Sequence, residues 1–364
     1  METAPVCLVP QGLAGARDFD GPPAVLVEQG RVKALGREAL ASNAPRHELP
    51  GLWLSPAPLD THVHLDMRGE PDQALAACRE AGLAAVRDLG RHPRNQPPGP
   101  APGPPLVVAA GVGLGPKGPA RYWLAEDLAG DRAFAQAVEQ RAADGCGVIK
   151  LFASGLLDHE QVGRVLHPVG LEPAEVRAAA QAAHAAGLKV AVHASGEEGV
   201  NLVLDQGVDC LEHGFFLGRD TLERLAGAGV YWAPTLAPIL AHAQDHDGRW
   251  DESARRGWVG IAQRQMAQVR LAAGLGVNLV LGSDAGSYGV PHGKGAFQEM
   301  DAWLEAGVDP GEVFVAATSR AARAMGLEDE VGGIFAGARA WLLATRRDPR
   351  HDPLELARPA WRGF

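Results

Sequence analysis

The sequence is poor in cysteine, and its few cysteines are scattered. The four cysteines stand at positions 7, 78, 146 and 210 and form no C-x-x-C pair. This spacing excludes a disulfide framework and a thiolate metal site, and it is typical of a protein from a reducing compartment.

The sequence also lacks a long hydrophobic run. Its longest apolar stretch, Leu106–Gly115, is well short of the roughly 18 residues that span a bilayer. The first 20 residues show no basic start followed by an apolar core, which a secretion signal would have. We therefore expect a cytoplasmic protein with no membrane partner.

Basic residues are in deficit. Lys and Arg together number 34 against 44 Asp and Glu, so the net charge is −10, and no basic cluster is present. Nucleic acid is therefore not an expected partner. Lysine is especially scarce, with five residues at positions 33, 117, 150, 189 and 294 against 29 arginines.

The chain of 364 residues is 46% hydrophobic and 21% charged, which suits one large α/β barrel with a small additional domain. From position 53 onward, short apolar runs alternate with Ala-, Leu- and Glu-rich stretches, the pattern of strand–helix units around a parallel sheet. The expected strands are Leu59–His64, Ala84–Asp88, Leu106–Gly111, Val148–Phe152, Val190–His193, Asp209–His213, Val230–Thr235 and Leu279–Asp284. The expected helices are Pro71–Ala81, Leu124–Ala143, Pro173–Ala186, Asp220–Gly227 and Ser253–Ala273. The expected fold class is therefore α/β, a (β/α)8 TIM barrel.

Both ends of the chain fall outside this alternation. Residues 1–55 and 326–364 hold short alternating runs with glycine turns, and we expect them to pair as one small β-sandwich domain beside a barrel of residues 56–325. Residues 93–105 hold seven prolines, which cannot propagate a helix, so an extended loop is expected there.

Polar residues end several of the expected strands. The first strand ends with His62 and His64, which a period of two places on one face, about 7 Å apart along the chain. His193, His213 and Asp284 end the fifth, sixth and eighth strands. Because the active site of such barrels lies at the carboxyl ends of the strands, we expect these groups to meet. The two histidines of the first strand by themselves fit equally well a buried pair bonded to backbone carbonyls.

Lys150 lies among apolar residues of the fourth strand. A buried ammonium is costly unless its charge is paired or removed. In a chain so rich in arginine, a lysine here favours chemistry that is specific to a primary amine, such as a shifted pKa or a covalent adduct. The alternative is a lysine that extends to the barrel rim.

Four imidazoles and one carboxylate suit Zn²⁺ best, with Mn²⁺, Fe²⁺, Co²⁺ or Ni²⁺ as alternatives. Two cations sharing the site would lower the pKa of a bridging water and yield a hydroxide that attacks a carbonyl. Asp284 is the candidate to orient that hydroxide, accept its proton and pass it to the leaving group.

Taken together, the motifs resemble those of the amidohydrolase superfamily over nearly the whole chain. The matching segments are Pro56–His64, Val148–Lys150, Val192–Ala194, Glu212–Gly214, Gly282–Gly286 and Ala317–Ala322. Glu212-His213-Gly214, 20 residues after His193, and Pro291-His292-Gly293 followed by Glu299 are most similar to the imidazolonepropionase-like and Xaa-Pro dipeptidase-like subgroup.

The resemblance implies a binuclear centre. One metal would be held by His62, His64 and Asp284, and the other by His193 and His213, with a carboxylated Lys150 bridging the two divalent ions. The candidate substrate contacts are His292 and Thr235, which follow the eighth and seventh strands. The Gly-Gly-His of the subgroup, which helps to polarise the substrate carbonyl, is replaced by Gly115-Pro116-Lys117-Gly118, which leaves Lys117 or Arg121 as candidates for that role.

The leading hypothesis is a metal-dependent hydrolase of an amide bond in a small-molecule substrate such as a dipeptide, an N-acyl amino acid or a cyclic amide. A first alternative is a deaminase of a heterocyclic base, for which Glu197, four residues after His193, would have to donate protons. A second is a barrel that keeps its metal and serves as a binding module. The oligomeric state stays open, a homo-oligomer included.

Overall fold

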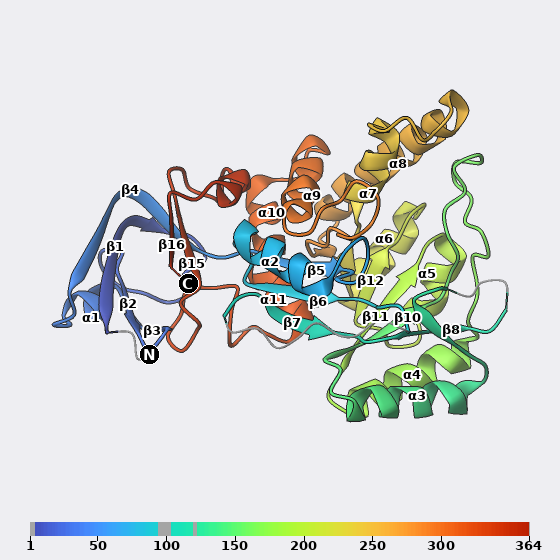
Figure 1. Ribbon diagram of the computed structural model, residues 1–364, viewed down its shortest axis with the longest axis horizontal. Coiled ribbons are helices and arrows are strands. Elements are labelled where there is room, and N and C mark those ends of the chain that lie inside the picture. Colours follow the sequence, from blue (N-terminus) through green and yellow to red (C-terminus); the bar gives the residue numbers. More distant parts are fainter. Residues whose placement is uncertain (1–3, 94–102, 119–121, 364) are drawn as a thin grey trace.

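The computed structural model describes residues 4–93, 103–118 and 122–363. A sheet built from both ends of the chain lies beside a larger α/β unit, and the two termini lie on the side of that sheet (Figure 1).

The sheet from the chain ends has six strands in the order β16-β15-β4-β1-β2-β3. Its elements are β1 (Val6–Leu13), β2 (Val25–Glu28), β3 (Arg31–Leu35), α1 (Gly36–Leu40), β4 (Arg46–Pro56), β15 (Leu342–Thr345) and β16 (Trp361–Gly363). A single sheet thus replaces the expected β-sandwich. The reason is the length of β4, whose 11 residues pair with β1 on one side and with β15 on the other, so the strands of both ends join edge to edge.

The α/β unit contains a parallel strand at each of the eight expected places, and most bounds differ only slightly. The strands are β5 (Leu59–Val63), β6 (Ala85–Asp88), β7 (Leu106–Ala109), β10 (Val148–Phe152), β11 (Lys189–Ala194), β12 (Cys210–His213), β13 (Tyr231–Ala233) and β14 (Asn278–Leu279). The eighth strand, expected over residues 279–284, is shortened to two residues and shares only Leu279 with the prediction. Two further strands, β8 (Gly113–Pro116) and β9 (Ala125–Leu128), continue the second sheet beyond β10.

The eight strands are divided between two sheets, β5-β6-β7 and β14-β13-β12-β11-β10-β8-β9, instead of forming the closed sheet that the sequence predicts. Backbone hydrogen bonds connect the two sheets on both sides. Gly147 N–H donates to Ala109 O at 2.9 Å on one side. On the other side, Thr61 N–H donates to Leu281 O, His64 N–H to Ala285 O and Asp284 N–H to His62 O, each at 2.8 Å. The ladders do not continue across these seams because β8 pairs beside β10 and β14 has only two residues. The strands nevertheless follow one another in the order of a (β/α)8 barrel.

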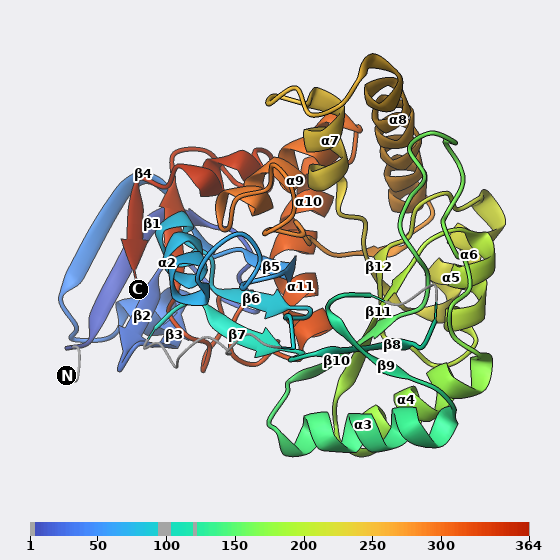
Figure 2. The same ribbon diagram turned by 45° about the vertical axis from the view of Figure 1, so that its right-hand side comes forward.

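The helices follow the strands and surround the parallel sheets, as two views of the chain show (Figures 1 and 2). They are α2 (Pro71–Ala81), α3 (Asp131–Ala143), α4 (Pro173–Ala185), α5 (Glu197–Leu204), α6 (Arg219–Ala228), α7 (Leu236–Gln244), α8 (Glu252–Gly274), α9 (Lys294–Glu305), α10 (Pro310–Ala317), α11 (Ser319–Met325) and the 3-10 helix η1 (Pro353–Ala357).

The prediction of one helix is partly wrong. The segment 124–143 was expected to be helical throughout, but residues 125–128 form β9, and α3 begins only after Gly130, whose φ is 86°. A left-handed glycine interrupts a helix, and the residues before it pair with β8 instead. Of the proline-rich segment 93–105, residues 94–102 lie outside the described residues, so the loop expected there stays a prediction.

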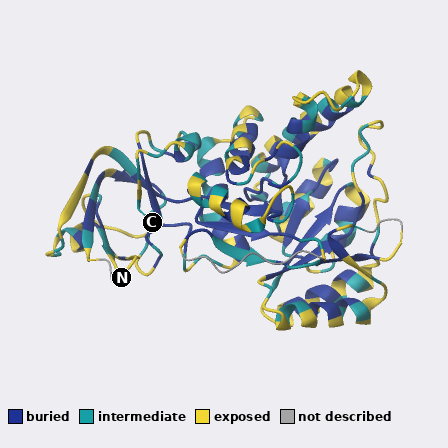
Figure 3. Cartoon of the chain, viewed as in Figure 1, coloured by how far each residue is buried: buried dark blue, intermediate teal, exposed yellow. Residues whose placement is uncertain are grey.

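The core lies between the parallel strands and the inner faces of the helices. Most of the parallel strands are buried, although β7 is only partly buried, and many exposed residues lie on the outer faces of the helices (Figure 3). Large side chains such as Trp232 and Trp303 have no exposed surface. Among the described residues, no helix has both the length and the apolar character needed to cross a membrane. The core thereby holds the carboxyl ends of the strands, which carry the predicted site, in fixed positions.

Candidate metal centre

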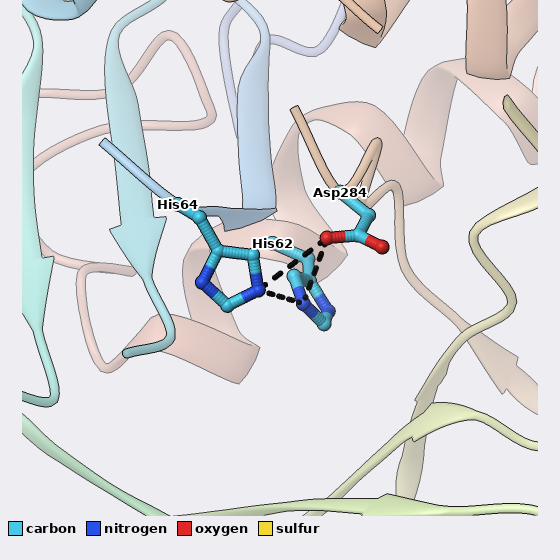
Figure 4. Close-up of side chains that lie close together, drawn as sticks. All are labelled: His62, His64 and Asp284. Atoms are coloured by element: carbon cyan, nitrogen blue, oxygen red, sulfur yellow. Dashed lines mark hydrogen bonds and ion pairs between the residues drawn. The ribbon is translucent and has the colours of Figure 1, made fainter. Parts of the chain in front are cut away.

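His62, on β5, and His64, just after it, project toward Asp284 from the same side of the strand (Figure 4). Their Nε2 atoms are 3.4 Å apart. Asp284 Oδ1 lies 3.6 Å from His62 Nε2 and 3.4 Å from His64 Nε2. The ligand atoms of this trio all lie within 4.8 Å of one another, which is close enough for one cation to contact all three.

The Nδ1 atoms of His62 and His64 both form hydrogen bonds. His62 Nδ1 lies 2.7 Å from Glu212 Oε2, and His64 Nδ1 lies 2.9 Å from the carbonyl oxygen of Gly90. Because both partners are acceptors, each Nδ1 carries the proton and each Nε2 is left with a lone pair. Burial lowers the pKa of His64 to about 4 and holds that of His62 well below its usual value. Both rings are therefore neutral, the form that binds metals.

Asp284 follows β14 with a φ of 55°, in the left-handed region. Its backbone N–H donates to the carbonyl oxygen of His62 at 2.8 Å, which fixes the turn against β5. Its Oδ1 is buried and has no hydrogen-bond partner among the described residues. Burial is the largest cause that raises the pKa of this carboxyl to about 7. A carboxylate oxygen buried without a partner is an unstable arrangement that a bound cation would relieve.

His193 and His213, from the ends of β11 and β12, form a second group beside the trio. Their ring centroids are 4.5 Å apart, and the ring of His213 lies 4.9 Å from that of His62. His213 Nδ1 lies 2.8 Å from Thr235 Oγ1, and His193 Nε2 lies 3.4 Å from Gly155 O. Burial lowers the pKa of His193 to about 3. The structure thus brings all four predicted histidines to one place, as two adjacent groups.

Lys150 lies in the middle of β10 and is 1% exposed. Its Nζ has no hydrogen-bond partner among the described residues and lies 5.2 Å from the centroid of the Phe152 ring. Burial is the largest cause that lowers the pKa of this amine to about 8, partly offset by the negative charges of Glu212 and Asp284. The side chain therefore does not reach the barrel rim, and the alternative of an exposed ammonium is wrong.

Sequence reasoning did not single out Glu212 and Arg87 as site residues. Glu212 is fully buried and accepts from Arg87 Nη2 at 2.8 Å through the oxygen that does not contact His62. Arg87 Nε also donates to the carbonyl oxygen of Thr61 at 2.7 Å. The signal that could have found them is a charged residue inside a short apolar strand, β12 for Glu212 and β6 for Arg87, because such a charge requires a buried partner.

A cavity of about 540 Å³ opens from this cluster. Its lining includes His64, Lys150, His193, His213, Asp284 and Thr235, together with many apolar and aromatic side chains. His292 is not among the lining residues, since its Nε2 lies 3.0 Å from the carbonyl oxygen of His64. Lys117 is exposed and does not line the cavity, and Arg121 lies outside the described residues.

These observations fit a divalent-cation site. Neutral imidazole nitrogens face one another with a buried carboxylate oxygen, and the unpartnered amine of Lys150 lines the same cavity. Nitrogen and oxygen donors in this combination suit zinc and similar ions.

The amidohydrolase family model matches residues 107–362, and the chain belongs to that family. A protein of Mycobacterium tuberculosis without an assigned function is 29% identical over 320 residues, which cover 85% of this chain and 83% of that protein. A Xaa-Pro dipeptidase with methionine bound in its active site has a TM-score of 0.80 at 22% identity, over 97% of both chains. A prolidase complexed with N-methylphosphonate-L-proline has a TM-score of 0.77 at 21% identity, over 97% of this chain and 95% of that one.

The family model confirms the resemblance to the amidohydrolases, and the Xaa-Pro dipeptidase and prolidase structures share the fold of this chain. The neighbours also imply a TIM barrel with a β domain. The family and the candidate site together support a metal-dependent hydrolase.

Proposed function

We propose that the protein hydrolyses a carbon–nitrogen bond, an amide or a peptide bond, in a small substrate. The observation that carries the proposal is the cluster of His62 Nε2, His64 Nε2 and the unpartnered Asp284 Oδ1, which lie 3.4 to 3.6 Å apart at one end of the cavity. The neighbours known as a Xaa-Pro dipeptidase and a prolidase support a peptide or related amide as the substrate.

In this proposal, His62, His64 and Asp284 hold one divalent ion, most simply Zn²⁺, and His193 and His213 hold a second. Lys150, in carboxylated form, would be the ligand that both ions share. When bound, such ions polarise the substrate carbonyl and lower the pKa of a water molecule. The two parallel sheets act as one (β/α)8 barrel, which carries all these groups at its carboxyl-terminal mouth.

The side chains of the protein supply the remaining steps. Asp284 orients the attacking water, takes up its proton and delivers that proton to the leaving nitrogen, so that the products are a carboxylic acid and an amine. Glu212 and the carbonyl of Gly90 hold the two histidines of β5 in the orientation that ligation requires. The cavity of about 540 Å³ has the size of a small-molecule site.

The position of Glu197 disfavours the deaminase alternative. Its Oε1 accepts from the backbone N–H of Gly218 at 2.7 Å, the residue is exposed at the start of α5, and it does not line the cavity. It is therefore not placed to give a proton to a substrate amine. The binding-module alternative would not require five potential ligands and a buried amine in one cluster.

The test is metal analysis combined with a substrate screen. The protein is loaded with Zn²⁺, its metal content is measured, and it is assayed against dipeptides, N-acyl amino acids, esters and lactones, with release of ammonia from purines, pyrimidines and pterins as the deaminase arm. We expect about two ions per chain and amide hydrolysis that is lost in Lys150→Ala and Asp284→Asn. Less than one ion per chain, together with unchanged activity in Lys150→Ala, would falsify the proposal.

A further inference from the structure

Four rings stack in series in the lining of the cavity. His159 lies 5.0 Å from Trp258, Trp258 lies 4.6 Å from His242, and His242 lies 4.8 Å from Tyr288, all between ring centroids. The successive interplanar angles are 12°, 19° and 16°. The rings come from the segment after β10, from α8, from α7 and from the segment after β14, and all four line the cavity. The four rings thus form one aromatic column in the cavity wall, assembled from distant parts of the chain.

This ring stack, His159–Trp258–His242–Tyr288, is held in place by neighbouring groups. The indole N–H of Trp250 donates to His242 Nδ1 at 3.1 Å, so the single proton of the neutral imidazole is on Nε2. Burial, followed by the charge of Arg249, lowers the pKa of His242 to about 4, which keeps the ring neutral. The carboxylate of Asp245 accepts from the backbone N–H groups of Arg249 and Trp250 at 3.0 and 3.2 Å. The surface therefore exists before any ligand binds.

Two arginines border the same surface. The guanidinium of Arg249 lies 4.1 Å from the centroid of the Tyr288 ring, and that of Arg68 lies 5.5 Å from it. Both arginines are exposed, both line the cavity, and neither forms an ion pair among the described residues. The nearby carboxylate of Asp247 accepts instead from the Tyr288 hydroxyl. The rim of the cavity therefore carries two positive charges that no carboxylate neutralises by direct contact.

The rest of the lining does not offset these charges. The one carboxylate among the described lining residues is Asp284, which belongs to the metal centre. The indole nitrogen of Trp258 is buried without an acceptor among the described residues, so the ring stack also contains an unmatched donor. Leu156, Leu157 and Ile239 add apolar surface. The outer part of the cavity thus combines aromatic and apolar walls with an excess of positive charge and hydrogen-bond donors.

We infer that the outer part of the cavity selects substrates that carry a flat aromatic ring and a carboxylate, as in an N-acyl derivative of an aromatic amino acid. The ring packs against the His159–Trp258–His242–Tyr288 stack, and the carboxylate pairs with Arg249 and Arg68. This inference rests on the proposed function for the reaction itself. Contacts between aromatic rings favour a planar ring over an aliphatic ring of similar size, and unpaired arginines favour anions over neutral isosteres.

The binding test uses ligands without an amide bond, so that no turnover interferes. Dissociation constants for 3-phenylpropanoate, 3-phenylpropan-1-ol and 3-cyclohexylpropanoate are measured on the Zn²⁺-loaded protein by calorimetry, with tryptophan fluorescence as a second signal from Trp250 and Trp258. We expect 3-phenylpropanoate to bind most tightly, and its advantage over the alcohol to shrink as NaCl is raised from about 0.05 to 0.5 M. Equal affinities for the carboxylate and the alcohol, or tighter binding of the cyclohexyl ligand, would overturn the inference.

Variants separate the arginines from direct contact of the carboxylate with metal. In Arg68→Gln/Arg249→Gln, the preference for 3-phenylpropanoate over the alcohol should fall roughly threefold to tenfold, since both side chains are exposed and screened. Arg255→Gln, an exposed arginine of α8 that does not line the cavity, should leave the preference unchanged. Tyr288→Leu should weaken the preference for the aromatic over the cyclohexyl ligand, and Tyr288→Phe should restore it. An unchanged preference in the double arginine variant counts against the assignment.

A hydrolysis assay distinguishes the two proposals. The ratio of kcat/KM for N-acetyl-L-phenylalanine and N-acetyl-L-phenylalaninamide is measured in the same variants. Selective binding of 3-phenylpropanoate without hydrolysis of any amide would contradict the proposed function and leave the specificity surface standing. If amides are hydrolysed with no preference for a carboxylate or for an aromatic ring, the result would support the proposed function. It would contradict the inferred substrate preference of the outer cavity.

Discussion

His62 Nδ1 lies 2.7 Å from Glu212 Oε2, and neither side chain has any exposed surface. Glu212 also receives Arg87 Nη2 at 2.8 Å, so one buried carboxylate holds an imidazole on one side and a guanidinium on the other. The pair decides which nitrogen of His62 faces Asp284. Glu212, on the distant strand β12, thereby orients His62 as a ligand of the candidate metal centre.

Replacing Glu212 by Gln should weaken metal binding. The carboxamide can still contact His62, but it lacks the charge that favours the Nδ1–H form, and a lost outer-shell partner typically costs 10- to 100-fold in metal affinity. It also leaves Arg87 without a counter-charge, so the free energy of unfolding should fall by about 3 kcal/mol or more. Zinc titration and urea unfolding measure the two effects. Glu223→Gln, which alters an exposed pair with Arg219 on α6, is the matched control. If Glu212→Gln binds zinc as tightly as the unaltered protein, Glu212 does not orient His62 for metal binding.

Replacing Lys150 by Met should stabilise the metal-free protein while reducing its capacity for metal. The buried Nζ has no partner among the described residues, and an apolar side chain of similar length removes that cost, for a gain of about 1–2 kcal/mol. Urea unfolding in the presence of a chelator and metal analysis after reloading provide the two readouts. Lys189→Met, on the neighbouring strand β11, should show neither effect. A less stable metal-free Lys150→Met variant would mean that the amine has a partner.

Adding one methyl group at Gly282 should disturb the centre through the backbone. A Cβ there would lie 2.9 Å from the Cβ atoms of both His62 and Ala233. Because neither atom can move without its strand, Gly282→Ala should cost about 1–3 kcal/mol and lower zinc affinity. Gly274→Ala, at the end of α8 with open space around it, should instead be neutral or stabilising by up to about 1 kcal/mol. Thermal unfolding and zinc titration of the two variants test this contrast, and equal behaviour would contradict it.

Glu299 should make stability depend on pH. It accepts from the backbone N–H groups of Leu236 and Ala237 at the start of α7, yet burial raises its pKa from 4.5 to about 7. A carboxyl whose pKa is raised by folding binds its proton more tightly in the folded state, so its contribution is complete below pH 4.5 and is lost as the pH rises through 7.

The measurement is the difference in unfolding free energy between the unaltered protein and Glu299→Gln at several pH values. The unaltered protein should lose roughly 3 kcal/mol relative to the variant between pH 4.5 and 8. The loss of one hydrogen-bond acceptor in Glu299→Gln changes the free energy of unfolding by the same amount at each pH, so it does not affect the pH dependence of the difference. A difference that stays flat, or that grows with pH, would show that the hydrogen bonds to Glu299 outweigh its burial.

Much of the scaffold could be predicted because its signal is local. Each of the eight strands was expected from an apolar run bounded by turn residues, and several helices from their composition and terminal glycines. The helix expected from Leu124 was partly wrong because Gly130 ends the pairing segment of β9, and the local composition does not show that pairing. The β-sandwich was replaced by one sheet because the reach of β4 to both β1 and β15 is a long-range property.

The sequence by itself determined which side chains come to the mouth of the fold. His62, His64, His193, His213 and Asp284 stand at strand ends, Lys150 lies within a strand, and parallel strands place such positions at one edge. Only the tertiary structure decided how these groups are oriented. The contact of Glu212 with His62, the exclusion of His292 from the cavity and the ring stack beside Arg249 depend on distances between segments that are far apart in the chain. The periodicity of the sequence indicates which face of a helix or strand a side chain lies on. The residue that it contacts across the interior is decided by how the elements pack.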